Sequence, residues 1–181
     1  DVCSSDLEPP KSDGNGFDRD NLLKASSLLD DAGWVLKNRQ RVNAQTGKPL
    51  SFELLIASGA NDQWVLPFKK NLARLGVTMN IRQVDMAQLT NRKRSRDYDM
   101  MQTLWAAQPW PSSDLQISWA SGYIDSSYNA PGVKSPVIDA LIAKIVAAQG
   151  DKNKLLPLGR ALDRVLTWNY YMLPMWYMGE D

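Results

Sequence analysis

The chain has 181 residues, enough for one domain of ordinary size. Hydrophobic residues make up 44% and charged residues 23%, a composition that excludes wholesale disorder. The chain has 21 basic and 20 acidic residues, a net charge of +1. This balance gives no electrostatic reason to expect nucleic-acid binding.

Residues 1–16 have the composition of a linker. They are polar and rich in Pro, Gly and Ser, and they lack the basic and apolar segments of a signal peptide. We expect a disordered linker or a non-native leader at 1–16. We expect the folded part of the chain over 17–181.

A first helix is predicted after Asp18, a residue type that favours the N-cap position. Leu22, Ala25 and Leu29 then recur at helical spacing, and Gly33 stands where a helix ordinarily ends. Two further elements follow in sequence. A short extended piece is expected at 34–36, and the basic stretch Lys37–Lys48 is interpreted as a turn on the surface.

Alternating apolar residues predict a strand over Phe52–Ile56. A helix over 65–75 is expected next, with Asn61 or Asp62 as its cap and Gly76 at its end. Pro67 is expected to bend this helix or delay its start. A second strand of alternating residues begins at 77.

A short helix through Met86 and Leu89 is expected to run into the basic cluster Arg92–Arg96, interpreted as a solvated helix end. A third strand is predicted over Tyr98–Trp105, with Tyr98 and Leu104 on one face. A proline-containing loop, a helix near 113–119 and a second loop follow.

Ser135 and Pro136 are typical of a helix start, cap followed by proline. The buried stripe of this helix is expected at Val137, Leu141, Ile145 and Ala148. Asp151 is predicted to cap a last helix, whose first turn Pro157 should make irregular. A final strand is expected over Tyr170–Tyr177, at an edge because of Pro174.

Strands that alternate with helices predict an α/β lobe, with a mixed sheet flanked by helices and at least some parallel pairing. No apolar run approaches the length needed to span a bilayer.

The residues for most catalytic chemistry are missing from the sequence. There is no histidine and only one cysteine, Cys3, which excludes His-dependent catalysis and Cys-based metal cages. Asp97 and Asp99 are two residues apart and can in principle share a proton or hold a cation, but a solvated strand start is the better interpretation. We therefore expect no enzyme activity, no metal site and no cofactor.

The segment 97–119 is the most informative for function. It is expected to run from a strand end into a loop, where open α/β sheets place ligands. The candidate ligand-binding residues are Trp105, Gln108, Trp110, Ser112 and Asp114. Aromatic planes with amides, hydroxyls and one acid favour recognition over reaction.

Several motifs in order resemble the C-terminal lobe of the family 5 extracellular solute-binding proteins, the peptide receptors of bacterial ABC importers. The resemblance covers roughly residues 17–178 and is greatest to the microcin C and oligopeptide branch. The motifs are ASSLLDDAGW, SFELLIA, LARLGVTMNIRQVD, DYDMMQTLW, KSPVIDALI, ALDRVL and YMLPMWY.

This resemblance implies that residues 17–181 are the C-terminal α/β lobe, truncated at both ends, of a protein with the two-lobed type II periplasmic-binding-protein fold. It implies a hinge-closing, monomeric receptor, periplasmic or lipid-anchored, that delivers oligopeptides or peptide-like solutes to an inner-membrane permease. Many family members have an aspartate three residues after the Trp that ends this strand, where it anchors the peptide's free amine. Gln108 takes that place here, which favours a blocked ligand N-terminus or a different orientation of the ligand. The competing hypothesis is the ligand-sensing lobe of a transcription regulator, which a helix-turn-helix upstream would distinguish.

Overall fold

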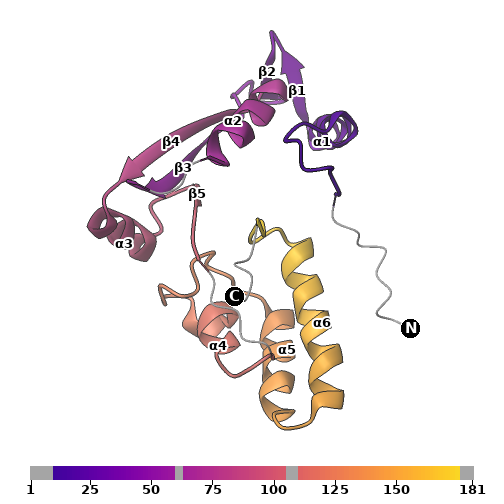
Figure 1. Cartoon of the computed structure of the whole chain (residues 1–181), viewed down its shortest axis with the longest axis vertical. Coiled ribbons are helices and arrows are strands. Elements are labelled where there is room, and N and C mark those ends of the chain that lie inside the picture. The colour runs from indigo at the N-terminus through magenta and orange to yellow at the C-terminus, as the bar shows by residue number, and fades with distance from the viewer. Residues whose placement is uncertain (1–9, 60–62, 105–109, 176–181) are drawn as a thin grey trace. The chain divides into compact units, whose positions relative to one another are not determined.

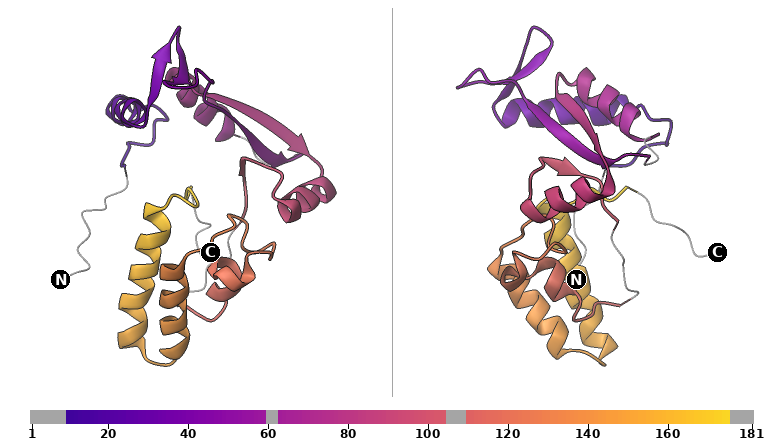
Figure 2. Two further views of the ribbon diagram at one scale, coloured as in Figure 1. Left: turned by 180° about the vertical axis from the view of Figure 1, so that it is seen from behind. Right: turned by 90° about the vertical axis from the view of Figure 1, so that its left-hand side faces the viewer.

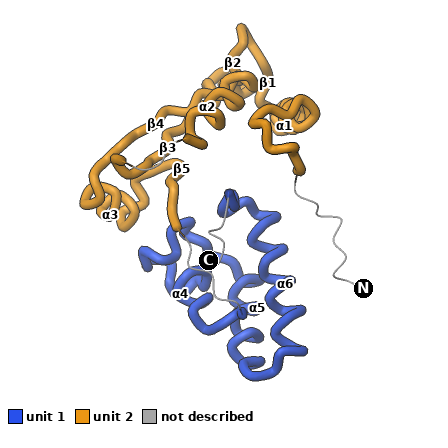
Figure 3. Tube along the Cα trace, viewed as in Figure 1, with its two compact units in different colours: residues 1–8, 105–181 blue, residues 9–104 orange. Residues whose placement is uncertain are grey.

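The computed structural model describes residues 10–59, 63–104 and 110–175 (Figure 1). The chain forms two compact units that divide after Leu104, coloured separately in Figure 3. That both units belong to one lobe of a larger protein stays a prediction, and each unit is described by itself.

The N-terminal unit contains a parallel three-stranded sheet and a separate antiparallel hairpin. The sheet has the order β4-β3-β5, and the hairpin pairs β1 with β2. In chain order its elements are α1 (Arg19–Asp31), β1 (Trp34–Lys37), β2 (Gln40–Asn43), β3 (Ser51–Ala57), α2 (Val65–Arg74), β4 (Thr78–Val84), α3 (Met86–Ser95) and β5 (Met100–Met101). The predicted α/β architecture with parallel pairing is confirmed.

The α2 helix covers one face of this sheet, as Figures 1 and 2 show. Leu54 and Ile56 of β3, Met79 of β4 and Val65 of α2 form a buried cluster. The alternation seen in the sequence therefore places the apolar face correctly. The α2 helix begins after Trp64 with no side-chain cap, while the predicted caps Asn61 and Asp62 lie outside the described residues.

The predicted ends of α1 are confirmed. The carboxylate of Asp18 accepts a hydrogen bond from the backbone N–H of Asn21 (2.8 Å), and Gly33 follows the helix with a positive φ of 81°. The segment before α1 also makes contacts, because Asn21 donates to the carbonyl of Lys11 and Asn71 of α2 donates to that of Gly16.

The third strand is much shorter than the prediction of Tyr98–Trp105. Among the described residues of this segment, 98–104, only Met100 and Met101 form ladder pairs with β3, and Leu104 is 91% exposed. Within the same residues, the last backbone hydrogen bond to β3 runs from the N–H of Gln102 to the carbonyl of Leu55 (3.2 Å).

The basic stretch Lys37–Lys48 is not simply a surface turn, because it contains β2 and the buried side chain of Arg41, which is 2% exposed. The guanidinium of Arg41 donates to the carbonyls of Trp34 (2.8 Å) and Leu75 (3.0 Å), and it pairs with the carboxylate of Asp30 (2.5 Å). It also donates to the hydroxyl and carbonyl of Ser26. One side chain thus joins α1, the hairpin and the end of α2.

Gly76, which follows α2, lets the backbone of Arg41 come close to the end of that helix. Its carbonyl accepts a hydrogen bond from the N–H of Arg41 (2.8 Å). A Cβ at this position would lie 2.9 Å from the backbone nitrogen of Arg41 and 2.8 Å from Leu36, and φ is +82°. A side chain is therefore excluded here by both space and conformation.

The C-terminal unit contains helices joined by loops, and no strand, over its described residues. It contains α4 (Leu115–Trp119), the 3₁₀ turn η1 (Ser121–Tyr123), α5 (Pro136–Ala147) and α6 (Lys152–Trp168). The last two run antiparallel and side by side (Figure 2). Their core is formed by Trp119, Val133, Ile138, Ile142, Ile145, Ala148, Leu155 and Leu162.

The predicted stripe of α5 is partly wrong. Ile145 and Ala148 are buried as expected, but Val137 is 57% exposed, and Ile138 and Ile142 are buried in its place. The sequence of α5 carries two neighbouring apolar stripes, so periodicity alone does not select the one that meets α6.

The end of the unit also differs from the prediction. The α6 helix is unbroken through Pro157, so the expected irregular first turn is not observed. Residues 170–175 contain no strand, against the prediction for Tyr170–Tyr177. Tyr170 instead takes a positive φ of 53° in a turn after α6, and Pro174 lacks the N–H that a ladder needs. None of the described helices is long and apolar enough to cross a membrane.

Replacing Arg41 with Met should lower the free energy of unfolding by about 3 kcal/mol, because the carbonyls of Trp34 and Leu75 lose a charged donor. Urea unfolding of the full-length protein measures this effect. The matched control is Lys37→Met, an exposed cation in the same hairpin. Equal losses in the two variants would contradict the structural role of Arg41.

Asp151 generates a prediction about pH. The side-chain hydrogen bond from Lys154 and the backbone N–H groups of Lys154 and Asn153 lower the pKa of Asp151 from its ordinary value of 3.8. Because the folded pKa is the lower one, the cap stabilises α6 at pH above about 4 and is lost as the pH falls through the folded value.

An NMR titration of the Asp151 carboxyl should place its pKa below 3.8. Lys154→Met should raise that pKa, whereas Lys144→Met on α5 should leave it in place. Titration of the wild-type carboxyl at or above its ordinary value would show that the Lys154 contact does not form.

Candidate functional site

Three of the five candidate residues lie in the described part of the chain. Trp110, Ser112 and Asp114 belong to the loop that leads into α4. Trp105 and Gln108 lie outside the described residues, so their place in the site stays a prediction.

Trp110 presents a partly open aromatic face. Its side chain is 47% exposed, and the Nζ of Lys152 lies 5.1 Å from the ring centroid. A cation at this distance is attracted by the ring. Lys152 begins α6, about forty positions along the chain, and the sequence contains no signal that links it to Trp110. The structure thus adds a residue that the sequence analysis missed.

Ser112 and Asp114 have different local roles. The hydroxyl oxygen of Ser112 accepts a hydrogen bond from the N–H of Asp114 (3.2 Å), which stabilises the turn before α4. The carboxylate of Asp114 makes no capping hydrogen bond to α4, although Asp114 occupies the N-cap position. Its acceptor oxygens are therefore not used by the helix they precede.

A second loop, between η1 and α5, is held from inside. Asn129 is fully buried, and its amide bonds both the N–H (2.9 Å) and the carbonyl (3.1 Å) of Val133. The carboxylate of Asp139 on α5 accepts from the N–H of Ser121 (2.8 Å). These contacts keep the chain after α4 in a fixed path.

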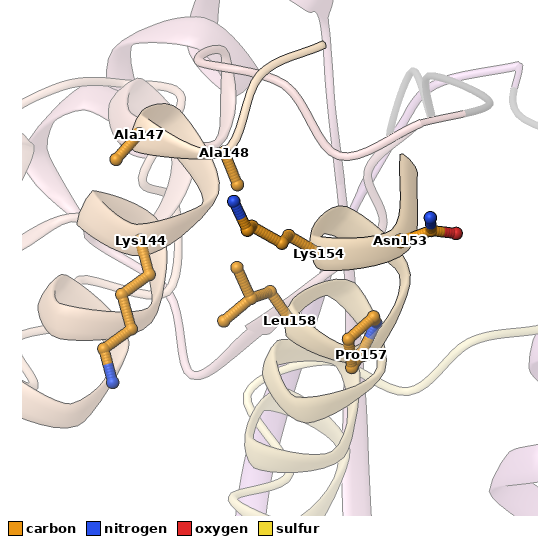
Figure 4. Close-up of a pocket in the computed structure, with 7 residues that line it drawn as sticks. All are labelled: Lys144, Ala147, Ala148, Asn153, Lys154, Pro157 and Leu158. Carbon is orange, nitrogen blue, oxygen red and sulfur yellow. The ribbon is translucent and has the colours of Figure 1, made fainter. Parts of the chain in front are cut away.

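An open hollow of about 480 Å³ lies where α5 ends and α6 begins (Figure 4). Lys154 reaches across it toward Ala148, while the amine of Lys144 points away. Asn153 and Pro157 both line the hollow. Because proline has no backbone N–H, Pro157 gives no helical hydrogen bond to the carbonyl of Asn153. The hollow shares no residue with the candidate set Trp110, Ser112 and Asp114 and is lined mainly by apolar groups.

The acidic pair considered in the sequence serves the fold of the N-terminal unit. Neither Asp97 nor Asp99 lies in a strand. Asp97 pairs with Arg92 (3.0 Å), and the carboxylate of Asp99 accepts from the N–H of Glu53 (2.8 Å). Within residues 10–59, 63–104 and 110–175, no three acidic, cysteine or histidine side chains are grouped as a metal site requires.

Comparison with known proteins identifies the family. The family model for bacterial extracellular solute-binding proteins, family 5 Middle, matches residues 4–127. The chain is 71% identical over 99% of its length to the uncharacterized protein YejA of Escherichia coli K12. It is 38% identical, again over 99% of its length, to the probable peptide-binding protein YejA of Agrobacterium fabrum.

Solved structures share the fold at lower identity. The oligopeptide-binding protein AppA of Bacillus subtilis, in complex with a nonapeptide, aligns with a TM-score of 0.71 at 19% identity over 90% of this chain. An oligopeptide-binding protein of Thermotoga maritima, bound to mannohexaose, aligns with a TM-score of 0.74 at 19% identity over 87% of this chain.

The chain covers only part of each of these proteins. It spans 30% of the Escherichia coli relative, 29% of the Agrobacterium relative and 34% of the Bacillus structure. The predicted resemblance and the type II periplasmic-binding-protein fold are both confirmed. The chain therefore belongs to family 5 of the bacterial extracellular solute-binding proteins.

Proposed function

We propose that the full-length protein is the substrate-binding component of an ABC importer, one that captures oligopeptides or peptide-like solutes and delivers them to a permease in the inner membrane. The observation that carries this proposal is the 38% identity over 99% of the chain to a probable peptide-binding protein. In this proposal the protein is a periplasmic monomer.

The candidate site offers both apolar and polar groups, so it suits a ligand that carries both kinds of group. A half-exposed indole next to a cation offers an apolar face and a charge, and the acceptors of Asp114 are not used by α4. Few polar groups around an aromatic surface are typical of recognition sites. Trp105, Gln108, Trp110, Ser112 and Asp114 are the proposed ligand-binding residues.

Family relatives and structural neighbours suggest which probes to compare. A relative in Agrobacterium fabrum, 33% identical, is described as a peptidoglycan-binding protein, and a structural neighbour binds murein tripeptide. Other neighbours were solved with mannohexaose and with Fe(III)-EDTA. Since these ligands differ in chemistry, a direct comparison decides between them.

The test is calorimetric titration of the full-length protein with trialanine, a nonapeptide, murein tripeptide, mannohexaose and Fe(III)-EDTA. Binding of at least one of the three peptide probes, with none to the sugar or the chelate, is the expected result. Binding only to mannohexaose or Fe(III)-EDTA, or to none of the five, would overturn the proposal.

Trp110→Ala should weaken binding of the peptide probe by about 1–3 kcal/mol, since a central aromatic anchor contributes on that scale. Titration of the full-length variant measures the loss. Trp168→Ala is the control, because Trp168 is exposed to a similar extent (51% against 47%) but lies at the end of α6. Unchanged affinity in Trp110→Ala would remove this residue from the site.

Gln108 generates a prediction about the ligand's N-terminus. A neutral amide returns only dipolar hydrogen bonds to a buried ammonium, whereas a carboxylate returns a charge-assisted one. Gln108→Asp should therefore shift preference toward free trialanine over N-formyl-trialanine by about 1–3 kcal/mol.

Paired titrations of the two peptides against the wild-type protein and Gln108→Asp measure that shift, with Gln102→Asp, six positions earlier in the sequence, as the control for an added charge. A strong preference of the wild-type protein for the free amine would mean that another acid, such as Asp114, holds the ammonium.

A further inference from the structure

Gly159 is in the interior of α6, where glycine is a poor helix former and its φ is not in the left-handed region. A Cβ at this position would lie 2.7 Å from the Cγ of Pro111. Because a proline ring is rigid, this contact leaves no room for a side chain. The Pro111 ring therefore packs directly against the backbone of Gly159.

The backbone of Pro111 is held as well. The side-chain amide of Gln149, in the turn that follows α5, donates to the carbonyl of Pro111 (3.2 Å) and to that of Ile145 (2.8 Å). Because Ile145 belongs to the last turn of α5, the second bond holds the amide against the end of that helix, and the first bond attaches the loop to it. The ring of Pro111 therefore packs on α6, and its carbonyl is held at the C-terminal end of α5.

Trp110 is the residue directly before this fixed point. A residue that precedes proline is restricted to extended backbone conformations, so the position of Pro111 limits where the indole can lie. The amine of Lys152 lies 5.1 Å from the centroid of the ring, and Trp110 stays 47% exposed. The backbone next to Trp110 is therefore held in place, whereas the residue itself stays partly exposed.

We propose that Gly159 and Gln149 are positioning residues for Trp110: they hold Pro111 so that the indole faces the ligand in a preformed position. The inference rests on the proposed function, which places Trp110 in the binding site. A recognition group that is already ordered loses less conformational freedom when the ligand binds, and this raises affinity. Neither positioning residue needs to touch the ligand.

The experiment uses the full-length protein labelled with 5-fluorotryptophan, and Trp110→Phe assigns the Trp110 signal. Gly159→Ala should shift the ¹⁹F resonance of Trp110 in the absence of ligand and weaken trialanine binding about tenfold. Gly122→Ala is the matched control, since a Cβ there meets nothing within 4 Å and its φ is not in the left-handed region. It should change neither quantity.

A double variant tests the contact itself. If Gly159→Ala acts by displacing the Pro111 ring, adding Pro111→Ala should cause no further loss of trialanine affinity, whereas Pro111→Ala alone should weaken binding. Gln149→Met, which keeps the side chain's length and removes its donor, should move the same ¹⁹F resonance and serves if Gly159→Ala fails to fold.

The outcomes separate this inference from the proposed function. A Trp110 resonance that stays in place in Gly159→Ala and Gln149→Met overturns the inference, with or without a ligand. A resonance that moves while trialanine affinity is unchanged overturns it too, and the proposed function then still stands. A wild-type protein that binds none of the peptide probes overturns the proposed function instead, and the ¹⁹F signal alone then decides whether Gly159 positions Trp110.

Discussion

The N-terminal unit depends on the burial of a single guanidinium. Arg41 gives its donors to Trp34, Leu75, Asp30 and Ser26, which lie in or beside three separate elements. A buried arginine is tolerated only when its donors are satisfied, so these acceptors must all be in place together. This requirement makes the arrangement of the hairpin, α1 and the end of α2 cooperative.

The C-terminal unit is organised differently. Its core is apolar, and its loops are held by buried or half-buried amides and carboxylates such as Asn129 and Asp139. The proposed recognition loop follows the same principle, because Pro111 is fixed by Gly159 and Gln149 while Trp110 stays open. In the proposed function, an ordered recognition group loses less conformational freedom when a ligand binds.

Much of the fold could be predicted because local signals agree with packing. The caps Asp18 and Asp151, the stop at Gly33 and the alternation through Leu54 and Met79 are all observed. The missed features are those that depend on distant partners. Burial of Arg41 needs acceptors from other elements, and the choice between two apolar stripes on α5 depends on α6. Of the candidate site, the sequence predicts Trp110. It contains no signal for Lys152, which lies near the Trp110 ring, or for Gly159, which contacts Pro111, because both contacts join residues far apart in the chain.

The position of β3 in the middle of the sheet has a consequence for how the chain folds. Both of its neighbours come later in the sequence, and the bond from the N–H of Glu53 to Asp99 joins residues 46 positions apart. Closing such loops costs entropy before any pairing rewards it, so non-local sheets form slowly. The sheet cannot be completed until the chain has been synthesised past Met101, and until then the edge of β3 that pairs with β5 leaves its backbone N–H and C=O groups without their strand partner.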